Sequence, residues 1–357
     1  MNAEIIEDIP KGQATIFDVA TLCGVSRGTV DRVIHRRGRV SQDTVDKVKR
    51  AIDILGYRPN PNASILASKK TVVFACLIPK FNHGEYWEKI YEGFVTGAKL
   101  MFSYNVEVKF YLYDQTSPES FVKCYGELLD DKPSGVIMNA VFRTETSEFA
   151  EKLEAAQIPY AFVDNKFDDL NYTLYYGTDP YKSGALGAFL LTNHCNPRDI
   201  ALVRLIRDKG HKADPNGPRR QGFLAYIEQR FPKCNVHTLF IDPSDAHQVY
   251  MTMHDFFSRH PQIKHIAMTN SRIYLIDEYL RNNPDPERIV VGFDDLEANL
   301  ASLKAGQIEY LVTRHIHRQS QYVLKAMTEA VVQGVKPAKR NNYLHMDILH
   351  RLNLDDY

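Results

Sequence analysis

The sequence is poor in cysteine, lacks a long apolar run and contains none of the common nucleotide-binding or zinc-protease motifs. Its five cysteines are odd in number and never form a C-x-x-C pair, so neither a disulfide framework nor a zinc knuckle is expected. No stretch approaches the roughly 18 apolar residues that a membrane-spanning helix needs. The patterns G-x-G-x-x-G, G-x-x-x-x-G-K-[ST] and H-E-x-x-H are all missing. We therefore expect no membrane partner, no cofactor, no metal site and no enzymatic activity.

The chain is long enough for two or three domains, at 357 residues against about 150 for a typical domain. Its hydrophobic share of 44% allows sizeable cores and excludes a disordered chain. The opening residues, MNAEIIEDIPKG, have neither the basic start nor the apolar stretch of a secretory signal. A cytoplasmic protein is the expectation.

The formal net charge is zero, but the charges are unevenly placed along the chain. Residues 15–70 carry eleven Lys or Arg against five Asp or Glu, whereas residues 71–357 carry 32 against 36. A small basic module therefore precedes a mildly acidic body. This distribution points to nucleic acid as a partner of the first part only.

Residues 15–57 predict three short helices around a shared core. Thr15 with Asp18 forms a capping box, and Ser26 and Ser41 are further N-cap candidates ahead of apolar residues at helical spacing. The expected helix ends are Gly24 and Gly56. Two helices joined by a Gly-containing turn of about three residues make a helix-turn-helix, whose arginine-rich second helix suits a DNA groove. The alternative is a solvated basic surface on a small bundle.

The segment TIFDVATLCGVSRGTVDRVIH, followed by GRVSQDTVDKVKRAIDILGYRPN, resembles the DNA-binding headpiece of the lactose-repressor/galactose-repressor (LacI/GalR) family of transcription regulators. The likeness runs from Thr15 to Asn60 without a gap. It implies base reading by Arg27, Gly28 and Arg32, and phosphate contacts by Ser26 and Thr29. The implied DNA-binding residues are Thr15, Ser26, Arg27, Gly28, Thr29, Arg32, His35, Ala63 and Leu66.

Two residues depart from the family pattern. Asp31 stands where the family usually has a small hydroxyl residue, and His35 where it often has Asn. Because phosphate repels a carboxylate, we expect Asp31 to pair with Arg27 one turn earlier or to accept a hydrogen bond from a cytosine amino group. The operator sequence is therefore not transferable from relatives.

Residues 58–70 predict a hinge with one short helix, ASILAS. Two prolines stop the preceding helix, and Asn62 can cap the short one, which is too short to be stable alone in water. The resemblance implies that two such helices, one per subunit, fold together in the minor groove and wedge Leu66 between base pairs. The small Ala63 then lets the two helices approach. The alternative is a linker whose leucine packs on the body.

From Val72 onward, apolar runs of strand length alternate with helical segments, which is typical of parallel sheets in βαβ units. The length exceeds one doubly wound sheet, so two similar lobes with a cleft between them are expected. Asn139, Asp164, Asn270 and Asp294 each end a predicted strand. Since ligands of open α/β sheets bind at the carboxyl ends of the strands, these side chains are expected to converge on one cleft. Taken singly, each is as well explained as a helix N-cap.

The body resembles the sugar-binding periplasmic-protein fold that this family carries behind its headpiece, with G-F-D-D and R-x-x-G-F as the clearest motifs. The expected fold class is an all-α helix-turn-helix headpiece followed by an α/β two-lobed periplasmic-binding-protein-like core. The expected divisions are a leader at 1–14, the headpiece at 15–57, the hinge at 58–70 and the effector-binding core at 71–357. Within the core, the expected N-lobe is about 71–175 plus 313–337, and the C-lobe about 176–312 plus 338–357.

The resemblance implies that Asp294 and Arg219 grip sugar hydroxyls and that Tyr86 and Trp87 pack on the sugar ring, although this aromatic pair is also compatible with ordinary core. Arg314 sits where many relatives place Gln. A neutral sugar leaves Arg314 without a full partner, which favours a sugar acid or phosphate unless Arg314 pairs with an aspartate or points out of the cleft. The implied ligand-binding residues are Tyr86, Trp87, Asn139, Asp164, Asn165, Arg219, Asn270, Asp294 and Arg314.

His315 and His317 could chelate a metal ion, but without a nearby third ligand they are expected to be a simple polar pair. The sequence as a whole predicts a homodimeric transcription regulator. It binds near-palindromic double-stranded operator DNA and responds to a small sugar or sugar derivative. The alternatives are a sugar-binding protein or a carbohydrate-active enzyme without specific DNA binding.

Overall fold

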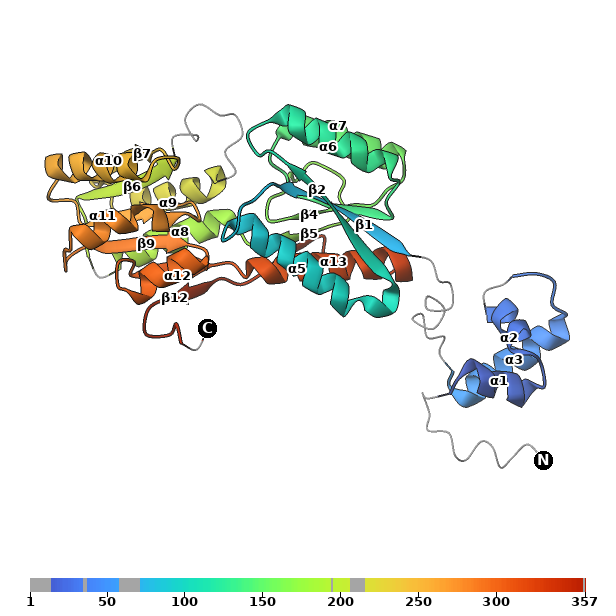
Figure 1. The fold of residues 1–357 in the computed structure, drawn as a ribbon. Helices are drawn as coiled ribbons and strands as arrows, with labels where there is room; N and C mark the ends of the chain where they lie inside the picture. Colours follow the sequence, from blue (N-terminus) through green and yellow to red (C-terminus); the bar gives the residue numbers. More distant parts are fainter. Residues whose placement is uncertain (1–13, 35–36, 58–70, 194, 206–215, 356) are drawn as a thin grey trace. The chain divides into compact units, whose positions relative to one another are not determined.

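The computed structural model describes residues 14–34, 37–57, 71–193, 195–205, 216–355 and 357 (Figure 1). The chain divides into two compact units, residues 1–69 and 70–357. Across the described ranges, no helix is both long and apolar enough to cross a membrane.

The first unit is the predicted three-helix headpiece. Thr15 caps the first helix, and both halves of the capping box with Asp18 are present. Ser41 caps the third helix, and Gly24 and Gly56 end the first and third helices in the left-handed conformation that glycine adopts without strain. The helices are α1 (Ile16–Cys23), α2 (Arg27–Ile34) and α3 (Gln42–Leu55). They share a buried core of Val19, Ala20, Val30, Val48, Ala51 and Leu55.

The second unit contains two six-stranded sheets, in the orders β11-β5-β4-β3-β1-β2 and β12-β10-β9-β8-β6-β7. Every neighbouring pair is parallel except β10 with β12, so the expected fold class is confirmed. The strands of the first sheet are β1 (Val72–Pro79), β2 (Val106–Tyr113), β3 (Gly135–Met138), β4 (Tyr160–Val163), β5 (Leu174–Gly177) and β11 (Asn341–Tyr343). Those of the second are β6 (Asp199–Leu205), β7 (Asn235–Ile241), β8 (His265–Met268), β9 (Ile289–Phe293), β10 (Tyr310–Thr313) and β12 (Asp347–Leu349).

Helices cover both faces of each sheet, which gives each lobe three layers (Figure 1). In the N-lobe, α5 (Tyr86–Leu100) and α13 (Ile316–Gln333) pack on one face, and α6 (Pro118–Asp130) and α7 (Arg143–Ala155) on the other. In the C-lobe, α8 (Pro180–Thr192) and α9 (Gly217–Arg230) cover one face. The other face of the C-lobe sheet carries α10 (Ala246–Arg259), η3 (Ile273–Ile276), α11 (Asp277–Asn282) and α12 (Glu297–Lys304). In the N-lobe, the short helix η1 (Phe102–Tyr104) follows α5.

The chain crosses between the lobes three times: from β5 to α8, from β10 to α13 and from β11 to β12. The last crossing differs from the predicted lobe boundaries. Residues 341–343 were expected in the C-lobe, but β11 pairs with β5 and forms an edge strand of the first sheet. A strand as short as β11 carries little periodic signal, so only its pairing partner reveals the sheet to which it belongs.

Candidate functional site

The predicted DNA-binding face of the headpiece lies on α2. Ser26, Arg27, Gly28 and Arg32 are exposed, and Thr29 is half-buried. Thr29 donates its backbone N–H to the Ser26 hydroxyl at 3.2 Å, and the two hydroxyl groups lie 2.9 Å apart. The helix start is thereby fixed by the same side chains that are predicted to contact phosphate.

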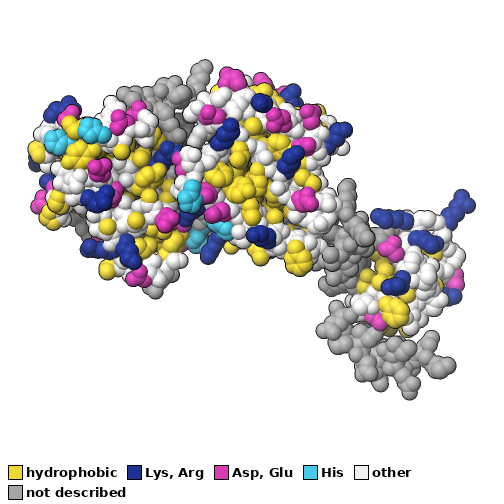
Figure 2. All heavy atoms as spheres, in the orientation of Figure 1, with side chains coloured by type: hydrophobic (Ala, Val, Ile, Leu, Met, Phe, Trp, Pro, Cys, Tyr) yellow, Lys and Arg dark blue, Asp and Glu magenta, His cyan; other side chains and the backbone are white. Residues whose placement is uncertain are grey.

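The surface around α2 is open and basic. An added Cβ at Gly28 would meet no atom closer than 3.8 Å, so this glycine leaves room for another molecule to approach the backbone. Figure 2 shows Lys and Arg side chains spread over the visible face of the headpiece. Thr15 is exposed beside α1, whereas the predicted contacts His35, Ala63 and Leu66 lie outside the described residues.

In the core, residues of both lobes line one cleft. Eight of the nine predicted ligand-binding residues lie on it: Tyr86, Trp87, Asp164, Asn165, Arg219, Asn270, Asp294 and Arg314. Asn139 is the exception, because its fully buried side chain lies behind the cleft, where its amide approaches Asp164 at 3.5 Å. The predicted convergence of polar strand ends is therefore present for the residues after β4, β8 and β9.

Arg314 lies at the centre of the cleft and bridges the two lobes. Its Nε and Nη2 donate to the two carboxylate oxygens of Asp294 at 2.7 and 2.9 Å, and its Nη1 donates to Asp164 at 2.8 Å. The guanidinium also lies over the Tyr86 ring, 4.9 Å from the ring centroid. Burial acts to lower the pKa of Arg314, but the negative charges of Asp294 and Asp164 and the Tyr86 phenol outweigh it and raise the pKa above its ordinary value.

Arg314 is therefore fully paired. The argument that a neutral sugar leaves this residue without a partner is wrong, because two aspartates already accept from it. The alternative, that Arg314 pairs within the protein, is confirmed. Sequence reasoning did not identify which aspartates pair with Arg314, because Asp294, the bidentate partner, is 20 positions away along the chain and Asp164 is 150 positions away.

Arg219 is the cleft cation that retains hydrogen-bonding capacity. Its side chain is buried, stacks 4.7 Å from the centroid of Phe293 and donates through Nη1 to the Thr269 carbonyl at 2.9 Å. Its Nε has no hydrogen-bond partner in the described part of the chain. Burial, followed by repulsion from Arg314, lowers the pKa of Arg219 to about 10, so the group is still charged at neutral pH. A ligand oxygen would satisfy this guanidinium.

Tyr86 and Trp87 give the cleft an aromatic wall. Their rings meet edge to face, with centroids 5.1 Å apart, and each residue is less than 10% exposed. Tyr86 donates its hydroxyl to Asp164 at 2.6 Å, and burial raises its pKa well above the ordinary value, so the phenol stays a proton donor. Trp87 is left as the ring that can stack on a ligand.

Two ion pairs that sequence reasoning did not identify join the lobes beside the cleft. Glu85 contacts Arg272 at 2.9 Å, and Lys89 contacts both the carboxylate of Asp295 at 2.9 Å and its carbonyl at 2.6 Å. The sequence hints at these pairs only because two of their members are next to predicted site residues: Glu85 directly precedes Tyr86, and Asp295 is the last residue of the G-F-D-D motif. The other lining residues are Gln115, Val141, Pro180, Asn216 and Ser271.

Comparison with known protein families gives two matches. Residues 15–60 match the family of bacterial regulatory proteins of the lacI type, and residues 74–334 match the periplasmic binding protein domain. The sucrose operon repressor of Streptococcus mutans is 30% identical over 220 residues, which are 60% of this chain and 62% of that protein. The HTH-type transcriptional regulator CelR of Thermobifida fusca is 33% identical over 148 residues, 42% of this chain and 43% of CelR. The alignments thus span less than two thirds of either relative.

Solved structures of similar fold include a protein from Bacteroides fragilis described as a LacI transcriptional regulator. It has a TM-score of 0.76 and 28% identity, and the match covers 81% of this chain and all of that one. A solute binding protein of an ABC transporter from Burkholderia graminis, in complex with D-arabinose, shares the fold at a TM-score of 0.70 and 18% identity, over 80% of this chain and 98% of that one. The chain therefore belongs to the periplasmic binding protein domain family, and ahead of that domain it carries a headpiece of the lacI family of bacterial regulatory proteins.

Proposed function

We propose that this protein is a transcription regulator that binds operator DNA through α2 and is controlled by a small neutral sugar in the cleft of its core. It acts as a homodimer on a near-palindromic site, in the cytoplasm where the DNA is, and has no catalytic role of its own. The observation that carries the proposal is the combination on one chain of an exposed, arginine-bearing recognition helix and a polar cleft closed by Arg314.

The charges of the cleft favour a neutral ligand. Among the described residues, its lining contains three cations and three anions: Arg219, Arg272, Arg314, Glu85, Asp164 and Asp294. A net charge near zero gives no general attraction to an acid or a phosphate. Within the described part of the lining, the ion pairs of Arg272 and Arg314 leave Arg219 as the cation with an unpartnered N–H.

The hydrogen-bonding groups favour a ligand with several hydroxyls. A carboxylate offers about four acceptor positions, so Asp164 and Asp294 can each accept from a hydroxyl in addition to Arg314. Arg219 donates to ligand oxygens, and Trp87 covers the apolar face of the ring. The sugars named for the relatives, sucrose and D-arabinose, set the class to be tested first.

The DNA-binding half of the proposal is tested by fluorescence anisotropy with duplexes selected from genomic fragments. We expect one near-palindromic duplex to bind at least about 10³-fold more tightly than random DNA, as is typical of specific recognition. Equal affinity for both would favour the alternative of a sugar-binding protein without operator recognition.

The ligand half is tested through Trp87, the only tryptophan of the chain. Titration with neutral sugars, matched sugar acids and sugar phosphates should change its emission for the neutral class alone. Arg219→Ala should abolish that response, whereas Arg143→Ala, which is not a lining residue and pairs with Asp169, should not. A response only to the acids or phosphates would overturn the neutral-ligand proposal without affecting the DNA-binding half.

A further inference from the structure

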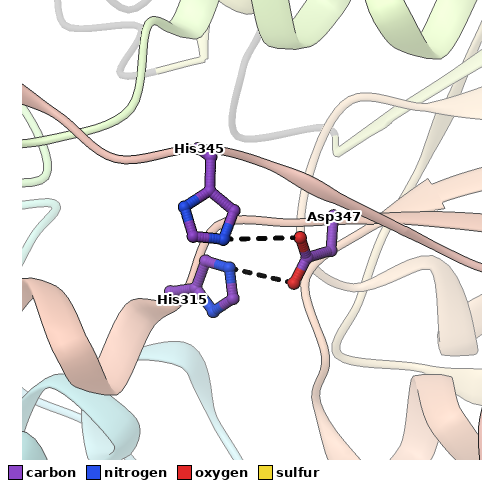
Figure 3. Close-up of side chains that lie close together, drawn as sticks. All are labelled: His315, His345 and Asp347. Carbon is purple, nitrogen blue, oxygen red and sulfur yellow. Dashed lines mark ion pairs between the residues drawn. The ribbon is translucent and has the colours of Figure 1, made fainter. Parts of the chain in front are cut away.

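Two of the three crossings between the lobes carry a cluster of potential metal ligands. His315 follows Arg314 on the crossing from β10 to α13. His345 lies on the crossing from β11 to β12, and Asp347 is the first residue of β12. Figure 3 shows both imidazole rings facing the same carboxylate, one toward each oxygen. Figure 2 shows histidine and acidic side chains gathered where the two lobes meet.

The ligand atoms are close enough to share one ion. The Nε2 atom of His315 lies 2.9 Å from Oδ2 of Asp347, and the Nε2 atom of His345 lies 3.6 Å from Oδ1. One ligand atom from each residue falls within 4.8 Å of the others. Ligands of a tetrahedral zinc ion, at about 2.0–2.1 Å from the metal, are about 3.4 Å apart. The observed separations lie on either side of that value.

His315 is the more buried of the two histidines, and its hydrogen bonding is incomplete within the described residues. The side chain of His315 is 9% exposed, and its Nε2 is buried without a hydrogen-bond partner among the described residues. The 2.9 Å approach to Asp347 is short enough for an ion pair but lacks the geometry of a hydrogen bond. A buried nitrogen left this way costs free energy that a coordinated ion would recover.

We propose that His315, His345 and Asp347 bind one divalent transition ion of the Zn²⁺ class. Two imidazoles and one carboxylate are a donor set that suits zinc and its neighbours rather than Mg²⁺ or Ca²⁺, which prefer oxygen ligands. The side chain of His345 is 71% exposed, so water has access to the fourth coordination position. The ion links the β10–α13 crossing to the β11–β12 crossing and fixes the segments that set the relation of the two lobes.

The pair considered from the sequence is not the one that the fold assembles. His315 and His317 are close along the chain, but the ligands that converge on His315 come from the segment after β11. The site also lies outside the sugar cleft, since none of its three residues lines that cleft. The proposal therefore does not depend on the identity of the effector.

The test uses the full chain, stripped of metal with EDTA and dialysed free of it, then titrated with ZnSO₄. Isothermal titration calorimetry should give one Zn²⁺ per chain, and thermal unfolding should move to higher temperature because the ion binds the folded state. His345→Ala and Asp347→Asn should each weaken binding at least about tenfold, since even partners outside the coordination sphere are worth about 10–100-fold.

His83→Ala is the matched control. His83 also contacts a carboxylate, Glu88, at 3.0 Å, but it belongs to no three-residue cluster of potential ligands in the described ranges. This variant should bind Zn²⁺ like the wild type. Both test variants should unfold at the wild-type temperature in EDTA, because His345 is largely exposed and Asn preserves the volume of Asp347. No saturable binding to the wild type, or equal affinity in all four proteins, would overturn the proposal and leave a His–Asp–His polar cluster.

Discussion

Asp164 and Asp294 occupy equivalent positions in the two lobes and share one guanidinium. Each is the first residue after a strand, β4 or β9, and each has a left-handed backbone conformation, with φ of 68° and 69°. Such a conformation is strained for a residue with a side chain, by about 1–3 kcal/mol. The contacts with Arg314 hold both aspartates in this strained arrangement and make one side chain the link between two sheets.

Arg314→Gln should lower the free energy of unfolding by about 3–5 kcal/mol, because it leaves two buried carboxylates without their counter-charge. Urea denaturation measures the loss. Arg143→Gln is the control: it makes the same substitution in an exposed pair with Asp169, so it should cost at most about 1 kcal/mol. Equal effects of the two substitutions would mean that the Arg314 network does not stabilise the core.

Arg32→Ala should reduce affinity for the selected operator by about 1–3 kcal/mol if Arg32 reads a base, with little change on random duplex. Arg50→Ala, at an exposed position on α3, should leave the ratio of specific to random binding unchanged. Anisotropy titrations on both duplexes at one salt concentration separate the cases. The same loss on both duplexes for Arg32→Ala would reduce its role to phosphate contact.

Gly184→Ala should destabilise the core by at least about 1–3 kcal/mol through forced overpacking. Helices α8 and α9 touch through their backbones here, and an added Cβ at Gly184 would lie 1.8 Å from the carbonyl oxygen of Arg219. The cleft should suffer as well, because Arg219 must move. Gly126→Ala on α6 meets no atom within 4 Å and should instead stabilise by about 0.5–1 kcal/mol. Urea denaturation of both variants gives the comparison, and a neutral result for Gly184→Ala would contradict the close approach.

Thr15→Val should cost the headpiece about 1 kcal/mol at neutral pH by removing the α1 cap. The Thr15 hydroxyl, followed by the Thr15 backbone N–H, lowers the pKa of Asp18 below 3.8. The stability that this hydrogen bonding adds is present above the pKa that Asp18 has in the unfolded chain. It is lost as the pH falls through the lower pKa that Asp18 has in the folded chain. An NMR titration of the Asp18 carboxyl should therefore show its midpoint rising in Thr15→Val. An unchanged midpoint would exclude the capping box as the cause.

The headpiece was predictable because its determinants are local. Thr15, Asp18, Ser41 and the two terminal glycines act within one turn of the helices they begin or end. The periodicity of strands and helices likewise predicted a two-lobed α/β core. These determinants depend on residues close together in the sequence, so the helices could be predicted without knowledge of tertiary contacts.

The sequence predicted which residues line the cleft, but not how they contact one another. The strand-end rule placed Asp164, Asn270 and Asp294 in one cleft, but it did not predict that Arg314 would donate to both aspartates. That choice depends on where the β10–α13 crossing places a side chain, which no spacing encodes. Asn139 also follows a strand, but its side chain is buried against Asp164 and does not line the cleft.

The three crossings also impose an order on synthesis. The first sheet needs β11 at its edge and α13 on one face, and both follow the segment from α8 to β10, which holds every C-lobe strand except β12. At about 5–20 residues per second, the ribosome takes roughly 10–30 s to pass from β5 to β11. During that interval the N-lobe has an open sheet edge and an uncovered apolar face. A nascent chain of this protein is therefore most exposed to aggregation and to chaperones while the segment between β5 and β11 is being translated.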